Sequence, residues 1–249
     1  MEGRVIHEIP LAKGKEELWP LAVGGVFDRL RWVHKRKLLM VSDYSDRKVF
    51  FVNIESGQII KTITLRYRPA FLDVSPDGNL ALVASFQRGN YSILDLNDLS
   101  LKKKSQIKGQ IRGACVASNS MIAVSHYTPK KGYRVTLVSA FDDSKDVIPV
   151  DKWVDEITSD SLGEFVYAAS SLSGRIYKIG WGERTEPSRL VEKIQIGGFP
   201  IQLNLDEKND NLILPNYKFN KLGVYSLGDG KMLTELDFQE NIAELVVQP

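Results

Sequence analysis

Five polar residues recur along the chain where an apolar stretch ends: Asp43, Ser85, His126, Ser170 and Asn216. The next residue is aromatic in four of the five cases, namely Tyr44, Phe86, Tyr127 and Tyr217. Polar groups beside tyrosines suit recognition of a peptide or a small polar ligand, because tyrosine combines contact area with a hydroxyl group at low entropic cost. The alternative is structural: the rings pack between neighbouring units, and the polar side chains bind the backbone of the following turn.

Residues that carry catalysis or bind metals are sparse. The three histidines, His7, His34 and His126, fall at three different positions of the pattern, whereas a metal site needs several converging ligands. Ser125 and His126 are adjacent in a predicted strand, so their side chains point to opposite faces and cannot act as nucleophile and base. The sequence contains no Gly-x-Ser-x-Gly motif and no phosphate-binding glycine loop. It therefore predicts no catalytic residue, no metal and no cofactor, and Cys115 is expected to be a small buried apolar residue.

The elements that hold these residues are short strands. The stretch from Ala70 to Leu96 shows the pattern most clearly, with strands predicted over Phe71–Ser75, Leu80–Phe86 and Tyr91–Leu96 and a fourth over Leu99–Ile107. Between the first two lies Ser75-Pro76-Asp77-Gly78, typical of a turn, because proline presets one backbone angle and glycine accepts the positive φ that closes it. The second strands of successive units end at intervals of 42, 41, 44 and 46 residues, the range of four-stranded propeller blades. Because helical periodicity is nearly absent and such units must stack to bury their apolar faces, the sequence predicts an all-β propeller of four-stranded antiparallel blades.

Five blades are visible within a single domain that spans residues 1–249. We place them at residues 26–66, 69–108, 111–150, 154–196 and 200–238, with two further strands at residues 4–11 and 242–247 near the termini. The two terminal strands supply only half of a sixth blade. Three arrangements therefore remain open: a five-bladed ring with added terminal strands, a piece of a larger propeller, or a ring that a partner completes.

Composition sets the broad class. The chain is 43% hydrophobic and 26% charged, as in an ordinary globular protein, and its net charge of +2 is too small to indicate nucleic acid or a membrane as the partner. No apolar run is long enough to span a membrane, and the first residues lack the apolar core of a secretory signal. We therefore expect a cytoplasmic protein with no membrane partner, or an extracellular one if a leader has been removed. The single cysteine excludes an internal disulfide.

The order of apolar strand, Ser-Pro-Asp-Gly turn, apolar strand, short hinge and Ser-Ile-Leu-Asp-Leu strand resembles the YVTN-type repeat of bacterial and archaeal propellers, and more loosely the WD repeat. Residues 70–111 match best, and Pro69 and Pro200 stand where this family often has a proline. The Trp-Asp pair of WD repeats is absent from the sequence, and five units are visible where such families usually have seven. The resemblance implies the fold rather than a function. Through lactonase-type propellers it also allows a hard-cation site of Asp43, Asn216 and backbone oxygens on the axis.

Propeller topology assigns the charged loops to two faces. Loops between second and third strands, and those that lead into the next first strand, lie on one face, here called the top face, and every second-to-third hinge contains a basic residue. Closer to the axis on that face we expect Arg66, Arg68, Arg112, Lys152 and Trp153, with Trp153 as the best single candidate for a binding hot spot. The bottom loops are rich in Asp and Glu, and their main exception is the basic stretch His34-Lys35-Arg36-Lys37.

Two functions from different classes follow. The first, which we favour, is a non-catalytic interaction module or scaffold that binds an acidic peptide or protein surface on a basic top face rimmed by aromatic side chains. Its predicted binding residues are Arg66, Arg68, Arg112, Lys152, Trp153, Tyr44, Tyr127, Tyr217, Asp43, His126 and Asn216. The second is a lactonase-like hydrolase or small-ligand propeller that uses Asp43, His126 and Asn216 around an axial pocket. Nucleic acid is a third partner class for the basic face.

Overall fold

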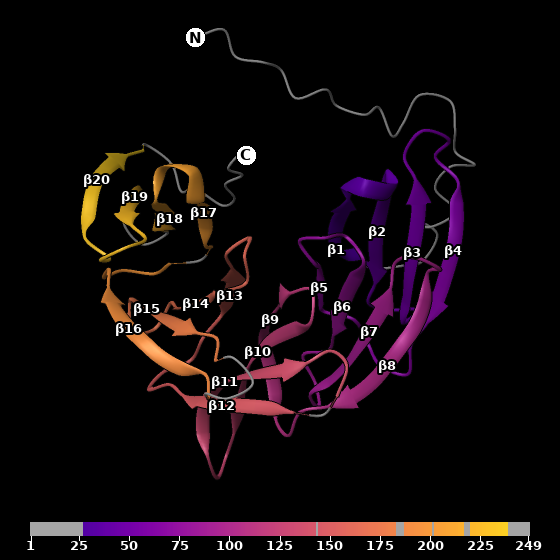
Figure 1. The fold of residues 1–249 in the computed structure, drawn as a ribbon, viewed down its shortest axis with the longest axis horizontal. Coiled ribbons are helices and arrows are strands. Elements are labelled where there is room, and N and C mark those ends of the chain that lie inside the picture. Colours follow the sequence, from indigo (N-terminus) through magenta and orange to yellow (C-terminus); the bar gives the residue numbers. More distant parts are fainter. Residues whose placement is uncertain (1–26, 143, 183–186, 201, 217–219, 239–249) are drawn as a thin grey trace, which may run out of the picture.

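The computed structural model describes residues 27–142, 144–182, 187–200, 202–216 and 220–238, and these ranges contain twenty β-strands. The strands form five four-stranded antiparallel sheets, each with its strands in sequence order. The sheets are arranged as propeller blades around a common axis (Figure 1). This confirms the predicted all-β fold. The predicted terminal strands at residues 4–11 and 242–247 lie outside the described residues.

Each blade runs from an innermost first strand to an outermost fourth strand (Figure 1). Blade 1 contains β1 Phe27–Val33, β2 Leu38–Asp43, β3 Lys48–Asn53 and β4 Ile59–Thr64. Blade 2 contains β5 Phe71–Val74, β6 Leu80–Ala84, β7 Asn90–Asp95 and β8 Ser100–Gln106. Blade 3 contains β9 Gln110–Ser118, β10 Met121–Thr128, β11 Gly132–Ser139 and β12 Lys145–Pro149. Blade 4 contains β13 Glu156–Ser159, β14 Phe165–Ser170, β15 Arg175–Gly180 and β16 Arg189–Gln195, and blade 5 contains β17 Asn204–Asp206, β18 Asn211–Asn216, β19 Lys221–Ser226 and β20 Met232–Asp237.

Two short 3-10 turns, η3 His34–Arg36 and η4 Glu207–Asn209, join the first two strands of blades 1 and 5. No helix in the described part of the chain is long and apolar enough to cross a membrane. The strand that we predicted over Leu80–Phe86 ends at Ala84, because the Ser85 N–H bonds the Asn90 carbonyl at 2.8 Å and closes the hinge. The aromatic residue Phe86 therefore lies in the hinge rather than in a strand.

The core consists of layers between neighbouring blades. Alternate residues of a strand point to opposite faces of its sheet, so in β7 Leu94 packs toward blade 1 and Ile93 toward blade 3, and both are fully buried. Four buried clusters join blades 1 and 2, 2 and 3, 3 and 4, and 4 and 5. Among the described residues no such cluster joins blade 5 to blade 1, and Figure 1 shows the five blades as an open arc.

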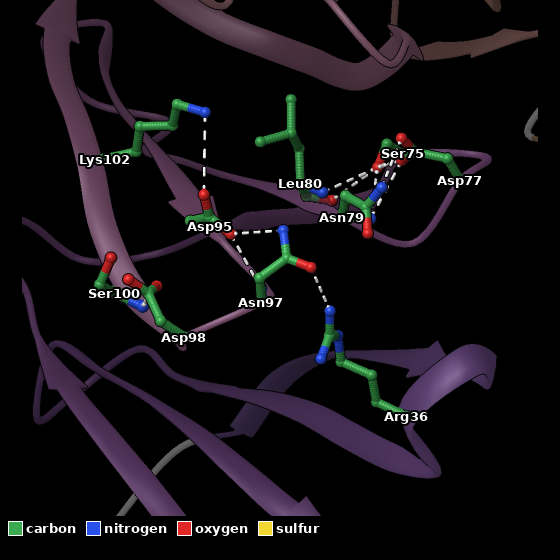
Figure 2. A network of polar contacts seen from close by, with 10 residues as sticks. All are labelled: Arg36, Ser75, Asp77, Asn79, Leu80, Asp95, Asn97, Asp98, Ser100 and Lys102. Atoms are coloured by element: carbon green, nitrogen blue, oxygen red, sulfur yellow. Dashed lines mark hydrogen bonds and ion pairs between the residues drawn. The ribbon is translucent and has the colours of Figure 1, made fainter.

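The Ser75-Pro76-Asp77-Gly78 turn shows why these residues form a tight connection. The Ser75 Oγ atom accepts the Leu80 N–H at 2.9 Å and donates to the Asp77 carboxylate at 2.6 Å, as Figure 2 shows. Gly78 adopts a φ of +66°, which residues with a Cβ atom rarely adopt. The turn motif is therefore satisfied by its own side chains and needs no ligand to hold it.

The basic stretch His34-Lys35-Arg36-Lys37, which the sequence places among acidic bottom loops, has local partners in the structure. Arg36 donates to the side chain of Asn97 in blade 2, which in turn bonds Asp95 (Figure 2). Lys37 forms an ion pair with Glu55 of its own blade. The Arg36–Asn97 bond joins the bottom of blade 1 to blade 2. The Lys37–Glu55 pair neutralises one of the positive charges on this face.

Candidate functional site

The top face gathers loops from different blades at one edge. Because successive strands are antiparallel, the β2–β3 hinge and the β4–β5 connection end on the same side, as the sequence predicts. Between blades 1 and 2 these loops enclose a pocket with a volume of about 310 Å³. We call it the top-face pocket; it is lined by Tyr44, Arg47, Arg66, Tyr67, Arg68, Ser85, Phe86, Gln87, Arg88 and Asn90.

Four arginines surround this pocket and no carboxylate lines it. Arg66, Arg68 and Arg88 are exposed, as is Arg47. Within the described part of the chain none of the four forms an ion pair. Four unneutralised guanidinium groups around one concave site create a strong positive potential that attracts anionic groups.

Arg47 occupies a backbone conformation that arginine rarely adopts. Its φ is 58°, in the left-handed region, at the hinge position where blade 4 has Gly174 and blade 5 has Asn220. Glycine and asparagine adopt this conformation readily, whereas other side chains meet a steric penalty. The strain at Arg47 makes the fold less stable at this position. A strained residue beside a pocket therefore suggests a function for its side chain.

Two arginine side chains pack on the recurrent aromatic residues, and each arginine follows the blade that carries its ring: Arg68 lies in the β4–β5 connection and Arg112 on β9. The Arg68 guanidinium carbon lies 5.2 Å from the centroid of the Tyr44 ring. That of Arg112, on β9, lies 4.3 Å from the Phe86 ring and 3.6 Å from the Trp153 ring. The guanidinium of Arg112 is thus held between two rings, and cation–π attraction links blades 2, 3 and 4 on the top face.

The aromatic group continues over blade 3. The ring centroids of Tyr127 and Tyr133 are 4.9 Å apart, and Trp153 lies 5.5 Å from Tyr133 and 6.0 Å from Tyr127. Trp153 is half-buried, and the neighbouring Lys152 is exposed. Tyr133 was not among the predicted binding residues. It lies directly opposite Tyr127 in the β10–β11 pair, and this register brings the two rings together. Tyr217 lies outside the described residues.

Two of the recurrent polar residues, Asp43 and His126, are bonded within the protein. Asp43 is buried, and its carboxylate accepts the Ser45 hydroxyl and the Asp46 N–H, both at 2.9 Å. His126 is also buried; its Nε2 lies 2.7 Å from Thr136 Oγ1 and its Nδ1 lies 3.2 Å from the Lys108 carbonyl oxygen. Burial lowers the pKa of His126, which favours the neutral imidazole at pH 7.

These positions correct one expectation, that Asp43 and His126 surround an axial pocket. Asp43 is the last residue of β2 and His126 lies within β10, and neither lines the cavity on the axis. Asn216 is the last residue of β18, and its side chain lies outside the described part of the structure. Within that part, no group of three or more His, Cys, Asp or Glu side chains is placed to hold a metal ion.

Positive charge on the top face is not uniform. In blade 4, Arg175 pairs with Asp151, which also accepts the Tyr177 hydroxyl; the Tyr177 hydrogen bond is the main cause that lowers the pKa of Asp151, and the charges of Lys193 and Arg175 add to it. In blade 5, Lys221 pairs with Glu235. The basic hinge residues therefore differ in pairing: Arg175 and Lys221 form ion pairs, whereas the four arginines of the top-face pocket form none among the described residues.

A second cavity lies on the axis and was missed by the sequence analysis. It has a volume of about 310 Å³ and is lined by residues of β1, β5, β9, β13 and β17 and by residues just before β17. We call it the axial cavity; its charged residues are Arg29, Arg31, Asp73 and Glu156. The signal available in the sequence was the presence of charged residues in three of the first strands, in Arg29-Leu30-Arg31, Leu72-Asp73-Val74 and Glu156-Ile157.

No protein-family model and no curated protein sequence matches the chain. Among solved structures, the β-propeller domain of Cps50 (Swd1) from Myceliophteria thermophila is similar over 81% of this chain and 67% of that one, with 16% identity and a TM-score of 0.67. The chain is a β-propeller. Dihydro-heme d1 dehydrogenase NirN, solved in complex with DHE, is similar to this propeller over 82% of its length and 44% of the NirN chain, with 18% identity and a TM-score of 0.67.

A functionally unknown protein from Desulfotomaculum acetoxidans DSM 771 is similar over 82% of the propeller and 67% of its own chain, with 12% identity and a TM-score of 0.70. At these identities the likeness shows the fold alone, and membership of the YVTN or WD family stays a prediction. The propeller described here spans about two-thirds of the length of two of these proteins and less than half of NirN.

Proposed function

We propose that this propeller is a non-catalytic interaction module that holds an acidic peptide segment of a partner protein on its top face, with the top-face pocket as the anchor. The observation that carries the proposal is the set of four unpaired arginines around one concave site without a carboxylate. A guanidinium group binds a carboxylate through two parallel hydrogen bonds, which gives geometric selectivity as well as attraction.

The surroundings of the pocket favour a peptide over a free anion. The positive surface continues from the pocket along the aromatic contacts of Arg112 and Trp153 to the exposed Lys152. Arginine, tyrosine and tryptophan are the side chains that are enriched at binding hot spots. A row of such groups across three blades fits an extended acidic segment better than a single small anion.

The hydrolase considered from the sequence has less support. The Asp43 carboxylate is bonded within its own hinge, the His126 ring is bonded to Thr136 of β11 and to the Lys108 carbonyl, and neither side chain lines the axial cavity. The interaction module is therefore the single function that we propose.

Fluorescence anisotropy with a short labelled peptide rich in Glu and Asp tests the proposal. The control peptide carries Gln and Asn at the same positions. The double variant Arg66→Glu/Arg68→Glu reverses two charges at the pocket, whereas Lys130→Glu/Lys131→Glu makes the same change in net charge at exposed residues of the blade 3 hinge. We expect the pocket variant to weaken binding by roughly 10- to 100-fold and the control variant to weaken it only slightly.

Two results would contradict the proposal. One is equal binding of the acidic and the amide peptide by the unchanged protein, because the arginines would then not select carboxylates. The other is tighter binding of a single-stranded oligonucleotide than of the acidic peptide, with an affinity that falls steeply as salt is raised, because this would assign the basic face to nucleic acid.

A further inference from the structure

The axial cavity contains both signs of charge, and they come from different blades. Arg29 and Arg31 extend from β1, Asp73 from β5 and Glu156 from β13. β1 and β13 belong to blades 1 and 4 and face each other across the axis in Figure 1. A volume of about 310 Å³ falls at the lower end of the range for small-molecule sites, so the cavity fits a compact ligand.

One pair of these charges is already used by the fold. The Nε atom of Arg31 lies 3.4 Å from the Asp73 carboxylate. The second oxygen of that carboxylate accepts the Val116 N–H of β9 at 2.8 Å. Asp73 therefore links blade 2 to blades 1 and 3, and the Arg31–Asp73 pair is close to electrically neutral.

The remaining pair of charges is unused. Within the described part of the chain, the guanidinium of Arg29 and the carboxyl of Glu156 form no hydrogen bond and no ion pair, although both line the cavity. Burial raises the pKa of Glu156 to about 7, and Arg29 is the charge that opposes this shift most strongly. Both groups line the same cavity of about 310 Å³ and are available to a ligand that enters it.

We propose that the axial cavity binds a small zwitterion of the free amino acid class, with the ligand carboxylate on Arg29 and the ligand ammonium on Glu156. A simple anion would face the carboxyl groups of Glu156 and Asp73, and a simple cation would face two guanidinium groups. A ligand that carries one charge of each sign neutralises both unused groups through charge-assisted hydrogen bonds, and the half-buried position of Glu156 strengthens the bond at that end. This site is separate from the top-face pocket and does not depend on the proposed peptide binding.

The protonation of Glu156 couples binding to pH. The charged and titratable groups that face it are Arg29 and Arg31 from β1, Asp73 from β5, Asp155 beside it in the chain, and Cys115 from β9. An ammonium group binds the ionised carboxylate, so binding at pH values below about 7 must release a proton. Affinity for the zwitterion is therefore expected to rise between about pH 6 and pH 8.

The test compares each ligand with two derivatives that lack one charge. The full chain is screened against the common free amino acids by thermal shift, and the best ligand is titrated by calorimetry together with its N-acetyl derivative and its amide. N-acetylation removes the ammonium group, and amidation removes the carboxylate. We expect each derivative to bind the unchanged protein at least about tenfold more weakly than the free amino acid.

Single substitutions then assign each contact. Glu156→Gln should weaken binding of the free amino acid about tenfold and leave binding of its N-acetyl derivative unchanged. Arg29→Gln should weaken binding of the free amino acid to the same extent and leave binding of its amide unchanged. Lys130→Gln, at an exposed hinge residue on the top face, is the matched control and should change nothing.

Three results would overturn the inference: no binding of any amino acid up to about 10 mM, equal binding of a parent and its two derivatives, or binding that neither Glu156→Gln nor Arg29→Gln affects. The comparison of derivatives uses the unchanged protein, so it decides the question even if a variant does not fold.

Discussion

The top-face pocket and the axial cavity have the same volume, about 310 Å³, but different parts of the blades build them. Loops form the top-face pocket, and its charges are of one sign, exposed and unpaired. The innermost strands form the axial cavity, and its charges are of both signs and partly bonded to the backbone of a neighbouring blade. A loop can present a charge without a consequence for the fold, whereas a charge on an innermost strand must be compensated by the fold itself.

The two sites should therefore respond differently to substitution, one in binding affinity and the other in stability. Substitution of a charge at the top-face pocket should change binding and leave stability nearly unchanged. Substitution of a charge at the axial cavity should change stability even when no ligand is present.

The largest effect should come from the pH dependence of stability at Glu156. Its pKa in the folded protein is about 7 against an ordinary value of 4.5, so between these values the folded protein holds a proton that the unfolded chain has lost. The free energy of unfolding should therefore fall as pH rises through this window, by roughly 2 to 4 kcal/mol from this group. Urea unfolding of the unchanged protein and of Glu156→Gln, from about pH 4.5 to pH 8, isolates the contribution as a difference. Parallel curves for the two proteins would show that this carboxyl is not held in a buried state.

Asp73 should give the next largest change. Asp73→Ala leaves the Val116 N–H without its acceptor and breaks the contact with Arg31, so we expect a loss of about 1 to 3 kcal/mol in the free energy of unfolding. Asp73→Asn keeps an oxygen that can accept the Val116 N–H, so its loss in the free energy of unfolding should be smaller. Arg66→Ala, on the top face, should stay within about 0.5 kcal/mol of the unchanged protein. Equal losses for Asp73→Ala and Arg66→Ala would remove the distinction between the two sites.

Arg112 is the top-face arginine that should behave as part of the fold. Its guanidinium lies between the Phe86 and Trp153 rings, so Arg112→Ala should lower the free energy of unfolding by about 1 to 2 kcal/mol. Arg68 contacts the single ring of Tyr44 at a longer distance, and Arg68→Ala should cost less than about 1 kcal/mol. Chemical denaturation of the two variants measures both values, and a larger loss for Arg68→Ala would contradict the role assigned to the double stack.

The smallest effect should be a gain in stability. Arg47→Gly removes a side chain from a left-handed backbone position, and we expect the free energy of unfolding to rise by up to about 1 kcal/mol, since relief of strain exceeds the added entropy of the unfolded chain. The same variant should bind the acidic peptide more weakly, because one of the four guanidinium groups is lost. A variant that is both less stable and equal in binding would show that Arg47 serves the hinge and not the pocket.

The fold could be predicted from the sequence because each blade repeats the same local signals. The strand spacing, the Ser75-Pro76-Asp77-Gly78 turn and the apolar strand interiors all specify the same four-stranded unit. Topology also places the loops of Arg68 and Tyr44 on the same face, although their contact was not predicted from the sequence.

The axial cavity could not be predicted in the same way. A charged residue in a short strand, such as Asp73, looks the same in sequence whether it points to solvent, to a neighbouring blade or to the axis. The pairing of Arg175 with Asp151 was equally hidden, because Asp151 lies in the connection between blades 3 and 4, Arg175 begins β15, and 24 positions separate them. Contacts between blades depend on side-chain direction, which strand periodicity fixes only as one face or the other.

Among the described residues the four inter-blade cores form a linear series, in which blades 1 and 5 each share one core with a neighbour and the internal blades share two. In such an array stability is approximately a sum of unit and nearest-neighbour contributions, and unfolding begins at the ends. Among the described residues, amide hydrogens of blades 1 and 5 should exchange with solvent earlier than those of β10 and β11 in blade 3. The top-face pocket bridges blades 1 and 2, so a bound peptide would also act as a clamp on one end of the series and slow the exchange of blade 1.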